Sequence, residues 1–289
     1  MNLQCILAVL LIFACLIPAS EATDYYSAEN IRRFAEYLYQ EGDYLRSVKE
    51  YNRYILVSQQ GADEALYKIG LCYRHIGDTQ KAVDFFQRLT KEYPQSDLKF
   101  SANYQIGYSY HLSERYKESI KYIGQVLKET EKENERQKLE ILLVLNYLNQ
   151  RQWRSADKLL NSKSEKPEDK AIEHIMLDLR DRSREGITLK RKNRLLACLM
   201  SIILPGSGKV YCNQYGNGIF SFAVVSTTGF LAFNGFHKNG VHSVNGWIFG
   251  SLCTVFYAGN IYGSGISALA YNRQAETDIL MRLPSPPDD

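Results

Sequence analysis

The sequence predicts an all-α protein, a helical solenoid of paired helices followed by a small helical membrane domain. Three observations lead to this prediction. A pattern of about 34 residues recurs through the first half of the chain. Residues 23–193 are rich in charged and polar side chains, whereas residues 195–271 hold only Lys209 and Lys238 as charged residues. An apolar run also opens the chain, from Cys5 to about Pro18.

The length and charge of the chain set limits on its class. Its 289 residues accommodate about two domains. The formal net charge is only +3, and both signs are mixed along most of the chain, so no nucleic-acid partner is indicated. We therefore expect a partner of another kind.

The first 22 residues read as a signal peptide. Ser20 and Ala22 have the small-residue spacing that signal peptidase recognises, which places cleavage after Ala22. Cys15 leaves open an acylated lipoprotein, and an uncleaved anchor is the third interpretation. Each of the three sends the following domain, residues 23–170, out of the cytoplasm.

The clearest repeat is "DEALYKIGLCYRHIGDTQKAVDFFQRLTKEYPQS", residues 63–96. Gly70 and Ala82 are small residues that let two antiparallel helices approach closely, and Pro94 ends the second helix. The segment resembles the tetratricopeptide repeat (TPR) along its whole length. The matching positions are Leu66, Ile69, Gly70, Tyr73, Gly77, Ala82, Phe86 and Pro94.

The same pattern of repeat positions recurs with weaker matches elsewhere in residues 23–170, which gives about four repeats. Residues 28–61 and 100–133 keep it, with Gly107 at the small position of the latter. Residues 137–170 carry Val144 there. Three repeats are about the minimum for a stable stack, so four suffice.

The TPR resemblance implies a peptide-binding groove lined by the first helix of each pair, and hence a protein or peptide partner. A second interpretation is that several of the tyrosines only pack between repeats. The linkage "EYPQSDLKFSANYQIGYSY" also resembles that of periplasmic TPR proteins that serve envelope assembly in Gram-negative bacteria. The expected groove residues are Tyr39, Tyr67, Leu71, Arg74, Tyr104, Tyr108 and His111.

Residues 171–194 join the two domains. Apolar residues at helical spacing predict a helix that caps the last repeat. A basic cluster, Lys190–Lys192 with Arg194, then borders the apolar region, where it would meet anionic headgroups. A solvated linker is the alternative.

The apolar region, residues 195–272, predicts a helical membrane domain with membrane lipid as a partner. Residues 195–204 are too short to cross a bilayer and read as a re-entrant or short helix. Residues 218–236 and 246–270 are uncharged and read as spans. The tail, 273–289, is polar and expected to be disordered.

Small residues recur along the second expected span. They predict close helix packing, either between the two spans or with another copy of the chain, which would give a homo-oligomer. The amide of Asn260 is expected to make an interhelical hydrogen bond, with a transport role as the alternative. The glycines of these rows are Gly246, Gly250, Gly259 and Gly263.

The stretch "LPGSGKVYCNQYGNG" only looks like a phosphate-binding loop. Ile203 stands where the first glycine belongs, and Val210 follows Lys209 where a hydroxyl should bind magnesium. It resembles instead a Pro-Gly-x-Gly-Gln-x-Tyr signature of uncharacterised bacterial membrane domains, with Lys209 in place of Gln. The matching residues, expected to form a turn at the membrane boundary, are Pro205, Gly206, Gly208, Tyr211, Tyr215 and Gly218.

No pattern indicates catalysis, a cofactor or a metal site. Residues 195–271 contain no Asp or Glu, and the histidines lack metal-ligand spacing. The sequence therefore favours a non-enzymatic adaptor of the bacterial cell envelope, with periplasmic repeats and an inner-membrane anchor; an outer-membrane location is less favoured. The second hypothesis is a transport or protein-insertion component whose active part is the membrane domain.

Overall fold

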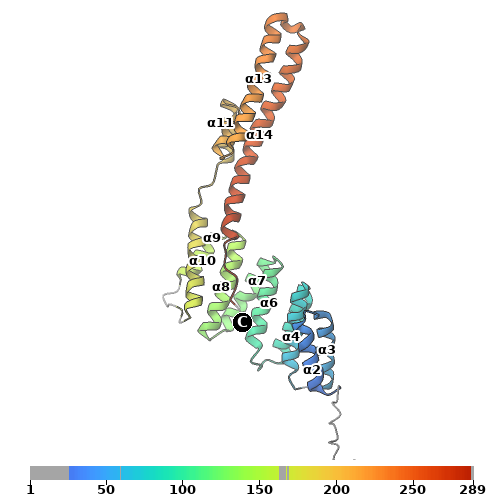
Figure 1. Cartoon of the computed structure of the whole chain (residues 1–289). Coiled ribbons are helices and arrows are strands. Elements are labelled where there is room, and N and C mark those ends of the chain that lie inside the picture. Colours follow the sequence, from blue (N-terminus) through green and yellow to red (C-terminus); the bar gives the residue numbers. More distant parts are fainter. Residues whose placement is uncertain (1–25, 59, 163–166, 168, 288–289) are drawn as a thin grey trace, which may run out of the picture. The chain divides into compact units, whose positions relative to one another are not determined.

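A computed structural model describes residues 26–58, 60–162, 167 and 169–287. Over these residues the secondary structure is helical, with turns and no strand (Figure 1). The all-α prediction is therefore confirmed. The expected signal peptide and Cys15 lie outside the described residues. Internal contacts divide the chain into two units, one ending at Glu135 and one spanning Arg136–Asp288.

The first unit consists of three helix pairs and the start of α8. Asp43 and Asp78 cap the second helices of the first two pairs, accepting the backbone N–H of Arg46 and Lys81 at 3.2 and 3.1 Å. Such capping satisfies donors that the helix cannot satisfy internally. The helices are α2 (Ala28–Gln40), α3 (Tyr44–Val57), α4 (Ala62–Ile76), α5 (Thr79–Glu92), α6 (Lys99–Leu112), α7 (Tyr116–Glu129) and α8 (Glu133–Asn149).

The turn inside each pair has the same geometry at four places in the chain. Its central residue takes a left-handed backbone conformation, and the next N–H donates to the carbonyl five residues earlier, as from Asp43 to Leu38 at 2.9 Å. Glycine adopts this conformation without strain, but other residues do so less readily. The four central residues are Gly42, Gly77, Glu114 and Arg151, with φ of 79°, 85°, 59° and 57°.

Small residues bring the two helices of a pair together. Ser47 and Ser119 donate hydroxyl hydrogen bonds across the pair, to the carbonyls of Ala35 and Gly107 at 2.9 and 2.8 Å. A Cβ added at Gly70 would stand 2.6 Å from the Phe86 ring, so only glycine fits there. Of the expected packing positions, Gly70, Ala82 and Gly107 lie where the helices touch. Pro94 is exposed in the turn that follows α5.

The second unit contains the rest of α8 and a bundle that ends in a long hairpin. α10 packs against α9, as expected for a capping helix. Asp169, Asn193 and Ser243 cap α10, α11 and α14 through their side chains. The helices are α9 (Trp153–Asn161), α10 (Lys170–Thr188), α11 (Arg194–Ile203), α12 (Ser207–Tyr211), α13 (Tyr215–Asn239), a short 3₁₀ turn (Gly240–His242) and α14 (Val244–Leu280).

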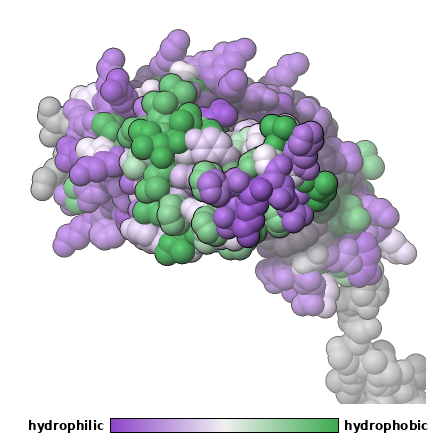
Figure 2. Space-filling view, turned by 90° about the horizontal axis from the view of Figure 1, so that it is seen from above, coloured by the Kyte–Doolittle hydropathy of each residue, from purple (hydrophilic) through white to green (hydrophobic). Residues whose placement is uncertain are grey.

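Helices α13 and α14 lie side by side as a hairpin (Figure 1). Many apolar side chains on them stay exposed, including Phe220 at 70% and Val255 at 68%. Seen from above, the surface shows broad hydrophobic areas beside hydrophilic ones (Figure 2). Among the described residues, one helix, Tyr215–His242, is long and apolar enough to cross a membrane.

The second expected span differs from its prediction. Residues 246–270 are helical, but α14 is not apolar enough by composition to count as a span by itself. The physical reason is that glycines, serines and Asn260 dilute its apolar side chains. Two of these polar residues contact the α11–α12 segment. The Ser264 hydroxyl lies 2.6 Å from that of Ser201 in α11, and Asn260 Oδ1 accepts the N–H of Gly206 before α12.

The expected disordered tail is also partly wrong. α14 continues through Leu280, well beyond residue 272. Ile279 is 1% exposed and belongs to the same core as Trp153 and Leu179, with Leu283 packed against it. The burial of Ile279, Leu280 and Leu283 holds this segment against the core. The sequence suggested a polar tail because these three residues stand among charged ones.

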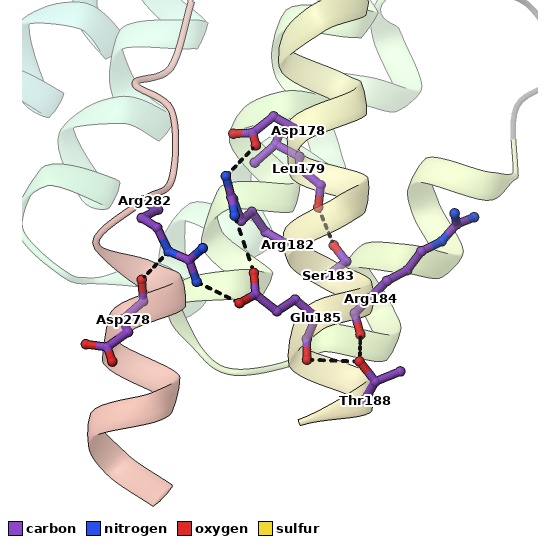
Figure 3. Close-up of polar contacts among 9 residues, drawn as sticks. All are labelled: Asp178, Leu179, Arg182, Ser183, Arg184, Glu185, Thr188, Asp278 and Arg282. Carbon is purple, nitrogen blue, oxygen red and sulfur yellow. Dashed lines mark hydrogen bonds and ion pairs between the residues drawn. The ribbon is translucent and has the colours of Figure 1, made fainter. Parts of the chain in front are cut away.

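Ion pairs hold the end of α14 against the bundle. Glu276 pairs with Arg151 at 2.6 Å and with Arg191 at 2.9 Å. Arg282 pairs with Glu185 of α10 at 2.7 Å, and Glu185 also accepts from Arg182 (Figure 3). The helix of the hairpin is thus fastened to the repeat side of this unit.

The link through Glu185 should weaken in acid. The hydrogen bond from Arg282 is the main cause that holds the pKa of Glu185 below its ordinary value of 4.5. The contribution is complete above that value and is lost as the pH falls through the lower pKa of the folded protein. Because both partners are largely exposed, we expect amide exchange at residues 277–283 to rise only about two- to fivefold, corrected for intrinsic rates.

The matched variant is Glu185→Gln, which mimics the protonated side chain. At pH 7, amides 277–283 of this variant should already exchange as fast as those of the wild type do in acid. Lowering the pH should then raise their exchange less than it does in the wild type. If acid raised amide exchange in Glu185→Gln as much as in the wild type, the Glu185–Arg282 ion pair would not be the cause of the rise.

Candidate functional site

We call the surface formed by α2, α4 and α6 around Tyr39, Arg74 and Tyr108 the groove face. These three helices are the first members of their pairs, and their side chains meet across it. Tyr39, Arg74 and Tyr108 are all half-buried, with part of each side chain open to solvent. Arg74 and Tyr108 are in contact with each other, whereas Tyr39 contacts His75 and Lys68, which were not among the expected residues.

Arg74 is the central cation of the groove face. Its guanidinium donates to Gln105 Oε1 at 2.6 Å and lies 5.4 Å from the centre of the Tyr108 ring. Among the described residues Arg74 has no carboxylate partner within ion-pair distance. Its charge is held in place by a neutral amide and an aromatic face, so it can still bind an anionic group.

A second bridge links α2 to α4, and sequence reasoning missed it. Lys68 pairs with Glu36 at 3.0 Å and lies 4.9 Å from the centre of the Tyr39 ring. Burial raises the pKa of Glu36, but hydrogen bonds from Tyr51 and Lys68 outweigh it and hold the pKa below its ordinary value. The Glu36 carboxyl is therefore ionised at neutral pH. The sequence signal for this ion pair is a pair of opposite charges on the facing sides of two neighbouring first helices.

The ring of His75 completes this end of the groove face. It stacks on Tyr44 at 4.7 Å between centroids, and its Nε2 lies 3.3 Å from the Tyr39 hydroxyl. Burial, and then the charge of Arg74, lower the pKa of His75. The ring is consequently neutral at pH 7 and serves as a hydrogen-bonding partner of Tyr39.

Other expected groove residues have mixed positions. Tyr104 is only 1% exposed, so it supports the groove face from below and cannot line it directly. Tyr67 packs on Phe86 at 5.6 Å, and Leu71 lies against the same core. His111 stacks on Tyr108 at 6.2 Å. The alternative interpretation, tyrosines that only pack, therefore applies to Tyr104.

The turn at Gly206, between α11 and α12, forms a tight junction in the second unit. Gly206 has φ of 87°, and a Cβ there would stand 2.0 Å from the carbonyl oxygen of Gly218. A Cβ on Gly208 would stand 1.9 Å from the carbonyl oxygen of Ala197 in α11. The turn thus closes α11 and α12 onto each other and onto the start of α13.

Polar contacts complete the junction. Asn260 Oδ1 accepts the N–H of Gly206 at 3.2 Å, so its hydrogen bond runs to the turn before α12 and not to a neighbouring helix as expected. The Tyr211 hydroxyl accepts the N–H of Asn193 at 3.3 Å, and Lys192 lies 4.6 Å from the centre of the Tyr211 ring. Tyr215 is 61% exposed. Pro205 immediately precedes the turn.

The glycine rows of α14 behave differently along their length. A Cβ on Gly246 would meet the Phe236 ring at 2.8 Å, and one on Gly250 would lie in ordinary contact at 3.6 Å. Gly263 lies against the Lys209 side chain. Gly259 has no neighbour within 4 Å of such a Cβ, so its expected packing contact is absent among the described residues.

The described residues contain no group of three or more His, Cys, Asp or Glu side chains that could hold a metal ion.

Comparison with known families matches tetratricopeptide-repeat models at two places, residues 64–96 and 100–133. These segments cover most of α4 and α6, which contribute Arg74 and Tyr108 to the groove face, and all of α5 and α7. No curated protein matches the chain. The chain therefore carries tetratricopeptide repeats, whose general role is to bind protein partners.

Proposed function

We propose that this tetratricopeptide-repeat protein is a membrane-anchored, non-enzymatic adaptor of the bacterial cell envelope, which holds a protein partner on its groove face. The observation that carries the proposal is Arg74, a cation positioned by Gln105 and Tyr108 without a carboxylate of its own. Side chains that are already fixed lose little entropy when a partner binds.

The chemistry of the groove face favours a peptide with a carboxylate. Arg74 supplies the donor fork that recognises a carboxylate in two hydrogen bonds. Tyr108, whose ring lies 5.4 Å from the Arg74 guanidinium, and Tyr39 of neighbouring α2 offer aromatic surface where apolar side chains of the same peptide can pack. Lys68 is neutralised by Glu36 and adds little net charge.

Several features support the anchoring part of the proposal. One described helix is apolar enough to span a membrane, and exposed apolar side chains extend over α11, α13 and α14. We propose that α14 enters the membrane beside α13 and that the repeats lie in the periplasm, with the inner membrane as the anchor. Gly259, unlike Gly263 of the same row, has no atom near an added Cβ and would be available to a second copy of the chain.

Site-specific photocrosslinking in cells tests the proposal. A photoreactive phenylalanine analogue at Tyr108 should give a discrete crosslinked product, and the same analogue at exposed Gln87 on α5 should not. Arg74→Glu should reduce the Tyr108 product at least tenfold, because reversing a charge that contacts a carboxylate costs more than about 1.4 kcal/mol. Arg74→Lys should keep part of it.

Two results would contradict the adaptor function. One is equal crosslinking from Tyr108 and Gln87, and the other is a Tyr108 product that Arg74→Glu leaves unchanged. Circular dichroism and the melting temperature of Arg74→Glu serve as controls for folding. Reporter fusions at residues 30, 241 and 289 would test the membrane topology independently.

The transport or insertion hypothesis remains the second candidate, because Asn260 carries a buried amide nitrogen without a partner among the described residues. Deleting residues 195–289 is a poor test, since it also removes Ile279 from the core of α8–α10. Point variants are cleaner. Loss of function in Asn260→Leu with full function in Arg74→Glu would favour this second candidate.

A further inference from the structure

A cavity of about 320 Å³ opens among α12, α13 and α14. Lys209, Ser221 and Asn260 form its polar end, and Val224, Val255 and Phe256 are among its apolar walls. Small-molecule sites commonly enclose about 300–1,000 Å³. The cavity can therefore take a small headgroup and the start of an alkyl chain.

The polar end offers hydrogen-bond donors in excess. Lys209 Nζ donates to the Ser221 hydroxyl at 2.8 Å, which uses one of its three protons. The amide oxygen of Asn260 is occupied by Gly206, whereas its amide nitrogen is buried and has no acceptor among the described residues. Asn260 is 3% exposed, and a buried donor without an acceptor is costly.

The charge of Lys209 is also uncompensated. Among the described residues it makes no ion pair, and residues 195–271 contain no Asp or Glu that could supply one. The Lys209 side chain lies against Gly263 of α14, where an added Cβ would stand 3.4 Å from Lys209 Cε. Lys209 is half-buried among apolar helices, where a cation is stabilised by a counter-ion, and this stretch of chain contains none.

The position along the hairpin suits a lipid. Asn272 of α14 hydrogen-bonds to the backbone of Lys192 in the basic segment at 2.7 Å. Gly263 lies nine residues before Asn272, about 13 Å along the helix. If the basic segment lies at the headgroups, Lys209 stands near the boundary with the acyl chains, where its ammonium can draw in a lipid phosphate.

We propose that this cavity binds an anionic phospholipid, with its phosphate on Lys209 and Asn260 and the start of an acyl chain against Val224, Val255 and Phe256. The inference goes beyond the adaptor function, because it assigns the membrane domain a ligand of its own. Free phosphate shares the anionic chemistry but lacks the chain that the apolar walls would contact.

Native mass spectrometry of the full chain in a neutral detergent tests this inference. Phosphatidylglycerol should bind at one lipid per chain, at least fivefold more tightly than phosphatidylcholine with the same acyl chains. Lys209→Gln should remove that preference, and Lys209→Arg should keep it within about twofold. The matched control is Lys238→Gln, which removes the other lysine of residues 195–271 and should bind as the wild type does.

A second variant separates loss of binding from loss of folding. Val224→Phe fills the apolar wall while leaving both polar groups in place, and it should weaken phosphatidylglycerol binding with unchanged helical content. Equal binding of the two lipids, or an unchanged preference in Lys209→Gln, would overturn the proposal. Displacement of the lipid by micromolar inorganic phosphate would also overturn it, since it would identify a free anion as the ligand. Arg74→Glu should leave lipid binding intact, so this result is independent of the adaptor function.

Discussion

Gly208→Ala is expected to destabilise the packing of α11, α12 and α14 by at least about 3 kcal/mol, the upper end of ordinary overpacking costs. The added Cβ would stand 1.9 Å from the Ala197 carbonyl oxygen and 2.5 Å from Ser201 Oγ. The nearest of these atoms belongs to the backbone of α11, which cannot move aside as a flexible side chain can. Relief therefore requires α11 and α12 to separate.

That separation would break a chain of polar contacts. The N–H of Gly208 donates to Ser201 Oγ at 3.0 Å, and Ser201 is within 2.6 Å of the Ser264 hydroxyl on α14. Amide exchange in α11 and α12 of the detergent-solubilised chain would measure the loss. Protection in these helices should fall by a factor of at least 100 relative to the wild type.

Gly259→Ala is the matched control in the same domain. No atom lies within 4 Å of its added Cβ, and alanine favours a helix over glycine by about 1 kcal/mol. We expect it to be neutral or stabilising. Equal protection in Gly208→Ala and Gly259→Ala would show that the close approach of α11 and α12 does not matter.

Phe86→Ala is expected to destabilise the repeats by about 3–5 kcal/mol, the usual cost of removing a buried phenylalanine. Phe86 is 0% exposed and packs in a core that includes Leu66 and Ile106 from the neighbouring helices. The loss would open a cavity between α4 and α5 and loosen α6. Exchange of amides in α4 and α5 gives the free energy of opening.

A double-mutant cycle with Gly70 checks the mechanism. Gly70→Ala in the wild type places a Cβ 2.6 Å from the Phe86 ring, so it should be destabilising. In the Phe86→Ala background the ring is gone, and the same change should cost at least about 1 kcal/mol less. Additive effects would mean that the two residues do not limit each other.

Local sequence patterns predicted the helices of the repeats well. Gly42 and Gly77 mark turns that need a left-handed conformation, and Asp43 and Asp78 supply the caps that begin the next helices. The corresponding turns at Glu114 and Arg151 lack glycine, so nothing local announces their conformation. There the packing of the pair imposes it.

The candidate site was predictable only in part. Arg74 and Tyr108 could be placed on one face from the repeat frame, because that frame fixes helix register. The burial of Tyr104 could not, since it depends on which neighbouring side chains cover the ring. The pairing of Glu36 with Lys68 joins residues 32 positions apart, and only the distance between α2 and α4 decides it.

By itself, the sequence determined the helical character, the repeat frame and the uncharged stretch of residues 218–236. These follow from periodicity, turn residues and composition, which act over short distances along the chain. Only the tertiary structure decided that α14 continues into the core around Ile279, that Gly259 faces open space and that Lys209 lies beside Ser221. The physical reason is that burial and charge pairing depend on residues far apart in the sequence, such as Trp153 and Ile279, which meet only when the helices pack.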